Sequence, residues 1–516
     1  MAAKSPLMEQ YKSIKNEHKD AFLFYRLGDF YELFYDDAVT VSHELELTLT
    51  GKNAGPEGRV PMCGIPYHAA ETYIYRLVQK GYKVAICEQL EDPKKAKGLV
   101  KRDVIRIVTP GTILFENSIA DKSNNYLAYL YETDNDIDAV LADISTGECW
   151  WGIWDKKKER EAFFDMLSVY APTEAVCSLS DNFYGRLEAY CRARLGGCLL
   201  TRRGEEGDYP VPHVAEALGD ENIRRVFAWL AAYLKEMMKA DAAEFHTVMP
   251  IREEDCLLLG EDCLRNLEIT RNMRDGGRRG TLLEILDHTH TAMGARLLRR
   301  WLERPLTDVN RIIQRQDGIE ELTGHTTELS QLEEMLEHVF DFERILTRIE
   351  ANTTSPKDLL ALKASLGMIP EIKKLLSGTV SIVLRKLSDQ MDIHSTVYEL
   401  LDRSMNENGT GNIRDGKYIK EGYSAELDEV RSLSENSRKW IADLEEREKE
   451  KTGIKLKIGF NNVFGYYFEI TNANKVPIPE YYMRKQTLVN AERDITPELM
   501  EFETKGLSAK DKTDVL

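Results

Sequence analysis

The residues most able to carry chemistry are Gly28-Asp29-Phe30-Tyr31-Glu32, near the start of the chain. An aromatic ring such as Phe30 can wedge into a base step of DNA, unstack it in part and kink the duplex. Because phosphates repel a carboxylate, Glu32 would not serve as a general DNA ligand. It could distinguish one base from another by hydrogen-bonding an exposed base edge. The alternative is a short helix in which Phe30 and Phe34 share one apolar face and Glu32 is solvated between them.

A second group of residues is basic. Residues 451–493 contain seven Lys or Arg and three Glu, a net charge of +4 on a chain whose formal net charge is −18. Cations on a hairpin can grip DNA phosphates, because such contacts need reach rather than base geometry. In the alternative, these side chains are a solvated charged face or are structural. The candidates for contacts to the DNA backbone are Lys455, Lys457, Lys475, Arg484, Lys485, Arg102 and Arg106.

Two other groups resemble catalytic or metal sites. His288 and His290 are two positions apart, so within a helix they would point to different faces, and we expect no metal there. Asp143 ends a predicted strand with Glu148 nearby, as in an RNase H-type nuclease, but such chemistry needs several converging carboxylates to hold two metals. We therefore expect no nuclease activity. The eight cysteines form no CxxC pair and are expected to be reduced thiols.

A nucleotide-binding loop is absent from the sequence. No G-x-x-x-x-G-K-[ST] pattern occurs: Gly51-Lys52 lacks the upstream glycine, and no lysine follows Gly276-Gly277-Arg278-Arg279-Gly280. We therefore expect no cofactor in this chain and no ATP hydrolysis, so that the chain as given is not an enzyme.

Length and composition set the broad class. The 516 residues argue for about three to five domains. Hydrophobic residues make up 42% and charged residues 30%, which excludes a disordered chain and a membrane protein. The first residues lack the apolar run of a signal peptide, and no stretch approaches the ~18 apolar residues that span a bilayer. A cytoplasmic protein is expected.

The elements that must position these residues change in character along the chain. Alternating strand and helix patterns come first, and strands followed by helices come next, so two α/β domains are predicted. Long helical periodicities follow, and then a charged helical rod of about 45 Å that leads to a basic β-hairpin. The predicted fold is multidomain, α/β plus all-α, with divisions at 1–115, 116–245, 246–420, 421–495 and 496–516.

Several blocks of the sequence resemble the bacterial MutS family of mismatch-recognition proteins. They occur in the family's order and extend over nearly the whole chain. The clearest are 24–38, Pro61-Met62-Cys63-Gly64-Ile65-Pro66-Tyr67-His68-Ala69, Arg106-Ile107-Val108-Thr109-Pro110-Gly111-Thr112, Thr291-Ala292-Met293-Gly294, Gly465-Tyr466-Tyr467 and Asn490-Ala491-Glu492-Arg493.

This resemblance implies a role for each predicted domain. Phe30 would stack on a mispaired base and Glu32 would hydrogen-bond it. The five segments would be a mismatch-binding domain, an RNase H-like connector, a helical core or lever, a β-containing DNA clamp and the start of a returning lever helix. The implied function is recognition of mispairs and small insertion or deletion loops in double-stranded DNA during DNA mismatch repair.

The chain departs from the family in one large respect. The family's proteins carry an ATPase domain that uses ATP and Mg²⁺ and provides most of the homodimer contact, and we expect a truncated chain that could be monomeric. The family also implies a MutL-type partner and association with the nucleoid. The alternative function is a truncated scaffold or interaction protein that binds DNA without mismatch specificity.

Overall fold

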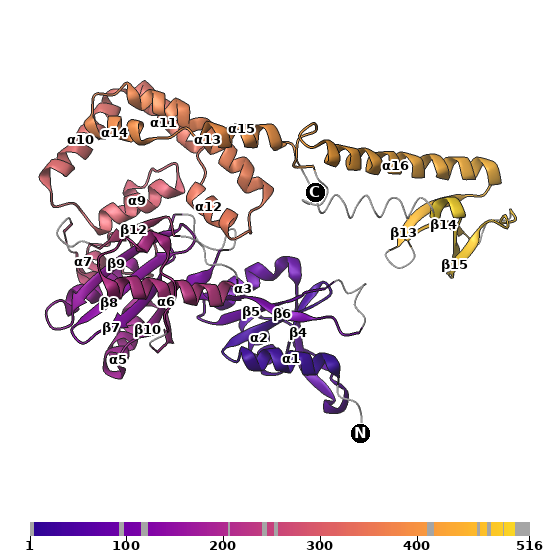
Figure 1. Cartoon of the computed structure of the whole chain (residues 1–516), viewed down its shortest axis with the longest axis horizontal. Coiled ribbons are helices and arrows are strands. Elements are labelled where there is room, and N and C mark those ends of the chain that lie inside the picture. The colour runs from indigo at the N-terminus through magenta and orange to yellow at the C-terminus, as the bar shows by residue number, and fades with distance from the viewer. Residues whose placement is uncertain are drawn as a thin grey trace. The chain divides into compact units, whose positions relative to one another are not determined.

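The computed structural model describes residues 5–91, 98–114, 122–204, 207–239, 245–251, 256–257, 259–409, 417–461, 465–471, 476–488 and 490–500. Side chains at 56, 430, 433–439 and 461 are not among the described parts. The chain divides into two compact units, residues 1–393 and 394–516 (Figure 1).

The first unit begins with a six-stranded mixed sheet in the order β3-β4-β2-β1-β5-β6. Helix α1 covers one face of this sheet, and α2 and α3 cover the other. The strands are β1 (Ala21–Leu27), β2 (Phe30–Phe34), β3 (Thr50–Asn53), β4 (Arg59–Pro66), β5 (Lys83–Gln89) and β6 (Arg102–Val108), and the helices are α1 (Pro6–Glu17), α2 (Tyr35–Leu45) and α3 (Ala70–Val78).

Residues 30–34 form strand β2, so the alternative of a short helix that carries Phe30 and Phe34 on one face is wrong. Tyr31 and Leu33 are buried, whereas Phe30 is 47% exposed, which is the two-residue period of a strand. Backbone pairing to β1 on one side and to β4 on the other holds β2 in register. The motif therefore lies on a fixed strand inside the sheet.

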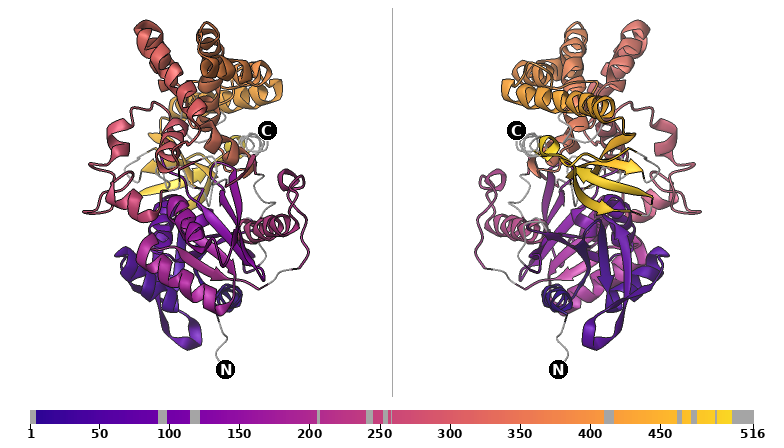
Figure 2. Two further views of the ribbon diagram at one scale, coloured as in Figure 1. Left: turned by 90° about the vertical axis from the view of Figure 1, so that its left-hand side faces the viewer. Right: turned by 90° about the vertical axis from the view of Figure 1, so that its right-hand side faces the viewer.

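A second six-stranded sheet follows, in the order β11-β10-β7-β8-β9-β12. Helices α4 and α5 pack on one face and α6 on the other, and Figure 2 shows these layers from two sides. The prediction that this segment opens with strands is confirmed by β7, β8 and β9. The bounds are β7 (Leu127–Glu132), β8 (Asp136–Asp143), β9 (Glu148–Asp155), α4 (Arg160–Tyr170), β10 (Glu174–Ser178), α5 (Asp181–Tyr190), β11 (Leu199–Arg202), α6 (Glu221–Met238) and β12 (Thr247–Pro250).

A buried carboxyl joins the first sheet to the second. Glu174 at the start of β10 is fully buried and accepts hydrogen bonds from the Thr109 hydroxyl, the Tyr233 hydroxyl and the Gly111 backbone N–H, the last at 3.0 Å. Burial raises the pKa of Glu174, although all three hydrogen bonds act to lower it. These bonds satisfy a group that would otherwise be costly to bury.

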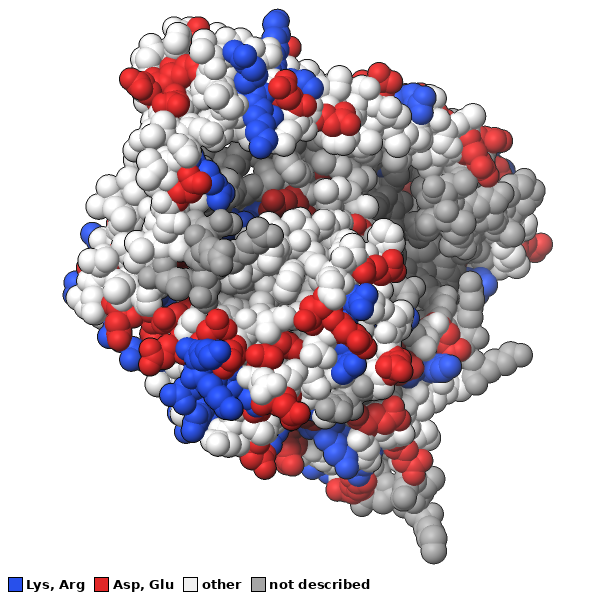
Figure 3. Space-filling model, turned by 60° about the vertical axis from the view of Figure 1, so that its left-hand side comes forward, with Lys and Arg blue, Asp and Glu red and all other residues white. Residues whose placement is uncertain are grey.

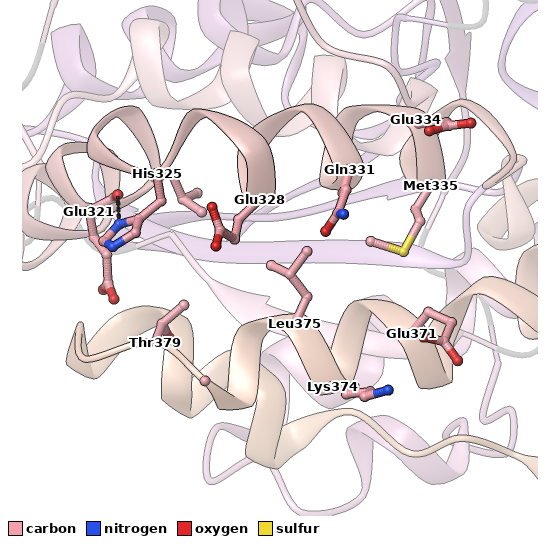
Figure 4. Close-up of a pocket in the computed structure, with 12 residues that line it drawn as sticks. Glu321, His325, Glu328, Gln331, Glu334, Met335, Glu371, Lys374, Leu375 and Thr379 are labelled. Atoms are coloured by element: carbon pink, nitrogen blue, oxygen red, sulfur yellow. Dashed lines mark hydrogen bonds between the residues drawn. The ribbon is translucent and has the colours of Figure 1, made fainter.

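The rest of the first unit is helical. Helices α10 and α11 face α13 across an apolar contact, in which Figure 4 shows Met335 and Leu375 pointing between the helices. The bounds are α7 (Glu261–Asn266), α8 (Leu282–Leu286), α9 (Ala292–Glu303), α10 (Val309–Gly324), α11 (Thr326–Glu337), α12 (Phe342–Glu350), α13 (Pro356–Ser377) and α14 (Ile382–Gln390).

The second unit contains the predicted rod and hairpin. Helix α15 (Ser395–Ser404) precedes α16 (Ala425–Thr452), and the antiparallel β13–β14 pair confirms the hairpin. Phe468 and Ile470 of β14 pack with Leu444 of α16 in the core of this unit. The sheet order is β13-β14-β16-β15, with β13 (Leu456–Asn461), β14 (Gly465–Thr471), β15 (Met483–Thr487) and β16 (Ala491–Ile495).

A helical turn begins after Thr496, at the end of the described ranges. The Leu499 N–H donates to the Thr496 hydroxyl at 3.3 Å, as an N-cap should accept. Residues 501–516, where the helix was predicted to continue, lie outside the described residues.

Two features are absent from the described ranges. No helix there is long and apolar enough to cross a membrane. In the same ranges no three His, Cys, Asp or Glu side chains lie close enough together to hold a metal ion.

Candidate nucleic-acid interface

Phe30 is positioned by the tight turn between β1 and β2. Leu27 pairs with Phe30, so only Gly28 and Asp29 connect the strands, and Gly28 has φ +58°. A two-residue hairpin needs a residue in this left-handed region, which glycine adopts without a steric penalty. The Tyr67 N–H donates to the Asp29 carbonyl at 3.0 Å and holds the turn against the end of β4.

The ring of Phe30 lies over a glycine. Phe30 pairs with Pro66 of β4, and a Cβ placed on Gly64 would come within 3.7 Å of the Phe30 Cδ1 atom. The absence of a side chain at Gly64 leaves one side of the ring open. The result is a large apolar group that is exposed on a strand held by backbone pairing on both sides.

Glu32 lies on the same face of β2 as Phe30, two residues along the strand. Its carboxylate is 2.5 Å from the Lys52 Nζ atom of β3, and the two side chains are only 18% and 33% exposed. The Lys52 ammonium also lies 5.5 Å from the centre of the Phe34 ring. Glu32 is therefore held in a fixed position beside Phe30, with its negative charge compensated. We call Phe30, Glu32 and Lys52 the Phe30 site.

Lys52 was missed by the sequence reasoning, which considered it only as part of a possible phosphate loop. Lys52 and Glu32 are twenty positions apart and meet because β4 pairs with both β2 and β3. Residues 50–53 are Thr-Gly-Lys-Asn and show no alternation of apolar and polar side chains, so neither the strand nor its partner and register could be read from them.

An arginine and a second exposed aromatic ring lie near the turn. The Arg26 guanidinium is 3.9 Å from the centre of the Tyr67 ring, and Tyr67 is 47% exposed. Arg26 is also paired with Glu88 at 3.2 Å, and Glu88 accepts the hydroxyl hydrogen bond of Tyr31. Burial, followed by this hydrogen bond, raises the pKa of Tyr31. Cation–π contacts of this kind keep a ring and a positive charge at the surface together.

Arg102 and Arg106, two candidates for phosphate contacts, donate to backbone carbonyls. Arg102 is 7% exposed and donates to the carbonyls of Arg26 at 2.8 Å and Val100 at 3.0 Å. Arg106 donates to the Thr112 carbonyl at 2.8 Å, and burial lowers the pKa of Arg106 to about 10. Arg102 is buried and Arg106 is half-buried, and both guanidinium groups hold the first sheet together.

Three of the five candidates in the second unit are exposed cations: Lys455, Lys457 and Lys485. We call these three the basic surface. Arg484 is engaged instead by Glu492 and by Asp494, the latter at 3.5 Å. Lys475 lies outside the described residues. On the face drawn in Figure 3, acidic and basic side chains lie among one another, so no field of a single sign covers that face.

The two carboxyls considered for nuclease chemistry lie opposite each other in the β8–β9 pair, but both are engaged. Asp143 is fully buried and accepts hydrogen bonds from the Asn124 amide at 2.9 Å and the Asn125 N–H at 3.1 Å. Glu148 pairs with Arg300 at 2.5 Å. Carboxylates bound in this way are structural, and the arrangement does not favour a metal site.

Comparison with known proteins gives a consistent result. The model of MutS domain I matches residues 5–117, and that of MutS domain III matches residues 262–500. The chain is 42% identical to the DNA mismatch repair protein MutS of Caldanaerobacter subterraneus subsp. tengcongensis over 98% of its own length, and 41% identical to that of Bacillus subtilis over 99%. It spans about 60% of the length of these relatives.

Proposed function

The chain belongs to the MutS family, and we propose that it recognises mispaired bases and small insertion or deletion loops in duplex DNA for mismatch repair. The observation that carries this proposal is the placement of Phe30. It is an exposed ring on a hydrogen-bonded strand, with a carboxylate fixed beside it on the same face.

Recognition would rest on the ease of deforming the DNA. A mispaired step stacks and pairs poorly, so kinking it costs less than kinking a regular step. Phe30 enters the weakened step as a wedge, and Glu32 accepts or donates a hydrogen bond at the exposed edge of a base. A matched step resists the same wedge, which gives the preference.

Lys52 supports this role of Glu32. An isolated carboxylate would be repelled by the phosphates on both sides of the groove. The ammonium at 2.5 Å compensates that charge and holds the carboxylate still, so that Glu32 can approach a base without a large electrostatic penalty. Lys52 is thus a positioning residue of the Phe30 site.

The basic surface would bind the DNA phosphates independently of the base sequence. Lys455, Lys457 and Lys485 are exposed to solvent, where their ammonium groups can reach phosphates. We assign the domain roles accordingly: 1–115 mismatch binding, 116–245 RNase H-like connector, 246–420 helical core, 421–495 DNA clamp and 496–516 returning helix.

Two observations argue against a nucleotide site at Gly51-Lys52. The sequence has no phosphate loop, and Lys52, the lysine that follows Gly51, lies in β3 with its ammonium on Glu32. We therefore attribute the use of ATP and Mg²⁺, homodimerisation and a MutL-type partner to full-length proteins of the family, and derive no step of recognition from them.

The proposal is tested by DNA binding. Fluorescence anisotropy on a G·T duplex and on its matched counterpart, at two salt concentrations, separates mismatch recognition from plain DNA binding. A preference for the G·T duplex at both salt concentrations is expected. The scaffold alternative predicts affinity that depends on salt but is equal on the two duplexes, and that result would reject the proposal.

A further inference from the structure

A cavity of about 210 Å³ lies in the first unit between α9 and the segments that flank β7 and α4. Tyr126, Tyr170 and Thr173 form part of one wall. The other wall is rich in arginine and consists of Arg271, Arg296, Arg299, Arg300, Glu303 and Arg304. So many guanidinium groups around one small space is unusual, because like charges gathered at low dielectric repel one another.

Helix α9 is the source of most of this charge. Arg296, Arg299, Arg300 and Glu303 are spaced three or four residues apart, so they lie along one face of the helix. That face is turned toward the cavity. A helix face that packs against a neighbouring domain would ordinarily be apolar.

Three of the arginines are neutralised within the protein. Arg296 is 3% exposed and binds Asp341 at 2.7 Å and Glu343 at 2.7 Å. Arg300 pairs with Glu148 at 2.5 Å. Arg299 pairs with Glu303 at 3.0 Å. These three guanidinium groups therefore serve the structure and are occupied by carboxylates.

Two further arginines, Arg271 and Arg304, line the cavity. Arg304 donates to the hydroxyl of Tyr170 at 3.0 Å, which is a neutral acceptor. Arg271 is exposed and makes no hydrogen bond or ion pair with any residue that the structure describes. Its charged neighbours include Arg299, of the same sign, and Glu303. Arg271 thus presents an unsatisfied set of donors at the cavity.

We infer that this cavity binds a small oxyanion of the phosphate type, with Arg271 as its principal ligand and the Arg304–Tyr170 pair as a further part of its lining. The planar guanidinium fork matches the oxygens of phosphate better than those of a spherical anion such as chloride. The volume is sufficient for phosphate or pyrophosphate but is below the ~300 Å³ at which sites for larger ligands begin, so a whole nucleotide or a DNA strand does not fit.

A bound anion would touch both walls. One wall belongs to α9 and its flanks, and the other to the second sheet and α4, so the ligand would hold these two parts of the first unit together. Any ligand that binds only the folded state stabilises it by RT ln(1 + L/Kd), where L is the free ligand concentration, so the stabilisation grows with that concentration. The inference concerns a site remote in sequence from Phe30 and from the basic surface, and it does not depend on mismatch recognition.

The experiment uses the whole chain with inorganic phosphate and with pyrophosphate, at constant ionic strength set by chloride. Calorimetric titration and the thermal unfolding midpoint measure binding. The test variant is R271Q, and the matched control is R274Q, because Arg274 is an exposed arginine of the same segment that does not line the cavity. We expect about a tenfold rise in Kd for R271Q and no change for R274Q.

The place where the anion binds and the kind of molecule that supplies the phosphate group are tested separately. Hydrogen exchange should slow in peptides covering 123–126 and 169–173 when phosphate is added, and R271K, which retains the charge, should recover most of the binding. ADP and a short matched duplex serve as rival sources of phosphate groups, and neither should bind the cavity more tightly than pyrophosphate. The inference is overturned if the parent binds neither anion, if R271Q binds as the parent does, or if the nucleotide or the duplex protects these peptides more strongly.

Discussion

The Phe30 site and the basic surface are built in opposite ways. Phe30 and Glu32 lie on a strand paired on both sides, and Lys52 fixes the carboxylate from a third strand. Lys455, Lys457 and Lys485 extend into solvent from the second unit. Reading a base requires groups held within tenths of an ångström, whereas gripping a phosphate requires only charge and reach. The difference suggests that discrimination and affinity are carried by separate parts of the chain.

The largest expected effect comes from F30A. Removing the ring should abolish the preference for a mismatch, a loss of roughly 3 kcal/mol, which is the scale of unstacking one base step. Binding driven by phosphates should remain. Anisotropy on G·T and matched duplexes measures both quantities. The matched control is F460A, since Phe460 is an equally exposed ring, at 50%, in the second unit. If F460A lost the preference and F30A kept it, the assignment of the two regions would be reversed.

The second effect concerns affinity alone. Replacing Lys455, Lys457 and Lys485 by Ala should weaken binding to both duplexes equally, and each lost phosphate contact should flatten the plot of log affinity against log salt by about one unit. Lys158, whose side chain is 82% exposed in the first unit, provides a control substitution of the same type. An unchanged slope in the triple variant would show that the grip lies elsewhere.

A smaller effect is expected at the Glu32–Lys52 pair. E32Q removes the negative charge and should raise affinity for matched DNA. The difference in binding free energy between the G·T and the matched duplex should then shrink by about 1 kcal/mol. K52Q leaves the carboxylate without its cation, so affinity for both duplexes should fall by a similar amount. Measuring both single variants and the double variant gives the coupling between them. Additive effects would mean that the ion pair has no part in DNA binding.

The sequence located the Phe30 site but not its geometry. The motif identified Phe30 and Glu32, and the alternation of buried Tyr31 and Leu33 decided between strand and helix only once the sheet was known. The contact between Lys52 and Glu32 depends on the register of three strands, which no local pattern encodes. Arg102 was misplaced for a related reason: a polar residue in a strand can be buried when neighbouring carbonyls accept its hydrogen bonds.

A substitution outside the Phe30 site and the basic surface should change neither the mismatch preference nor the affinity for DNA. Burial first, and then the charges of Asp220 and Asp136, raise the pKa of Asp138 from 3.8 to about 7. The unfolded chain therefore loses this proton first, so stability should fall as pH rises from about 4 to about 7. In D138N the free energy of unfolding should depend less on pH, with a loss between about pH 4 and about pH 7 that is smaller by on the order of 1–4 kcal/mol. Urea unfolding at several pH values across this range measures it. A change in mismatch preference in D138N would argue against separate regions.

The mounting of Phe30 on a paired strand has a consequence for the search along DNA. A loop that ordered itself around each base pair would lose conformational entropy at every step that it tested. Here the backbone is already ordered when the protein folds, so testing a step costs little beyond the contact itself. The Phe30 ring can therefore leave a base step as quickly as it enters one. Under the proposed function, short visits to matched base pairs and long visits to mispaired ones would follow from the stiffness of one strand.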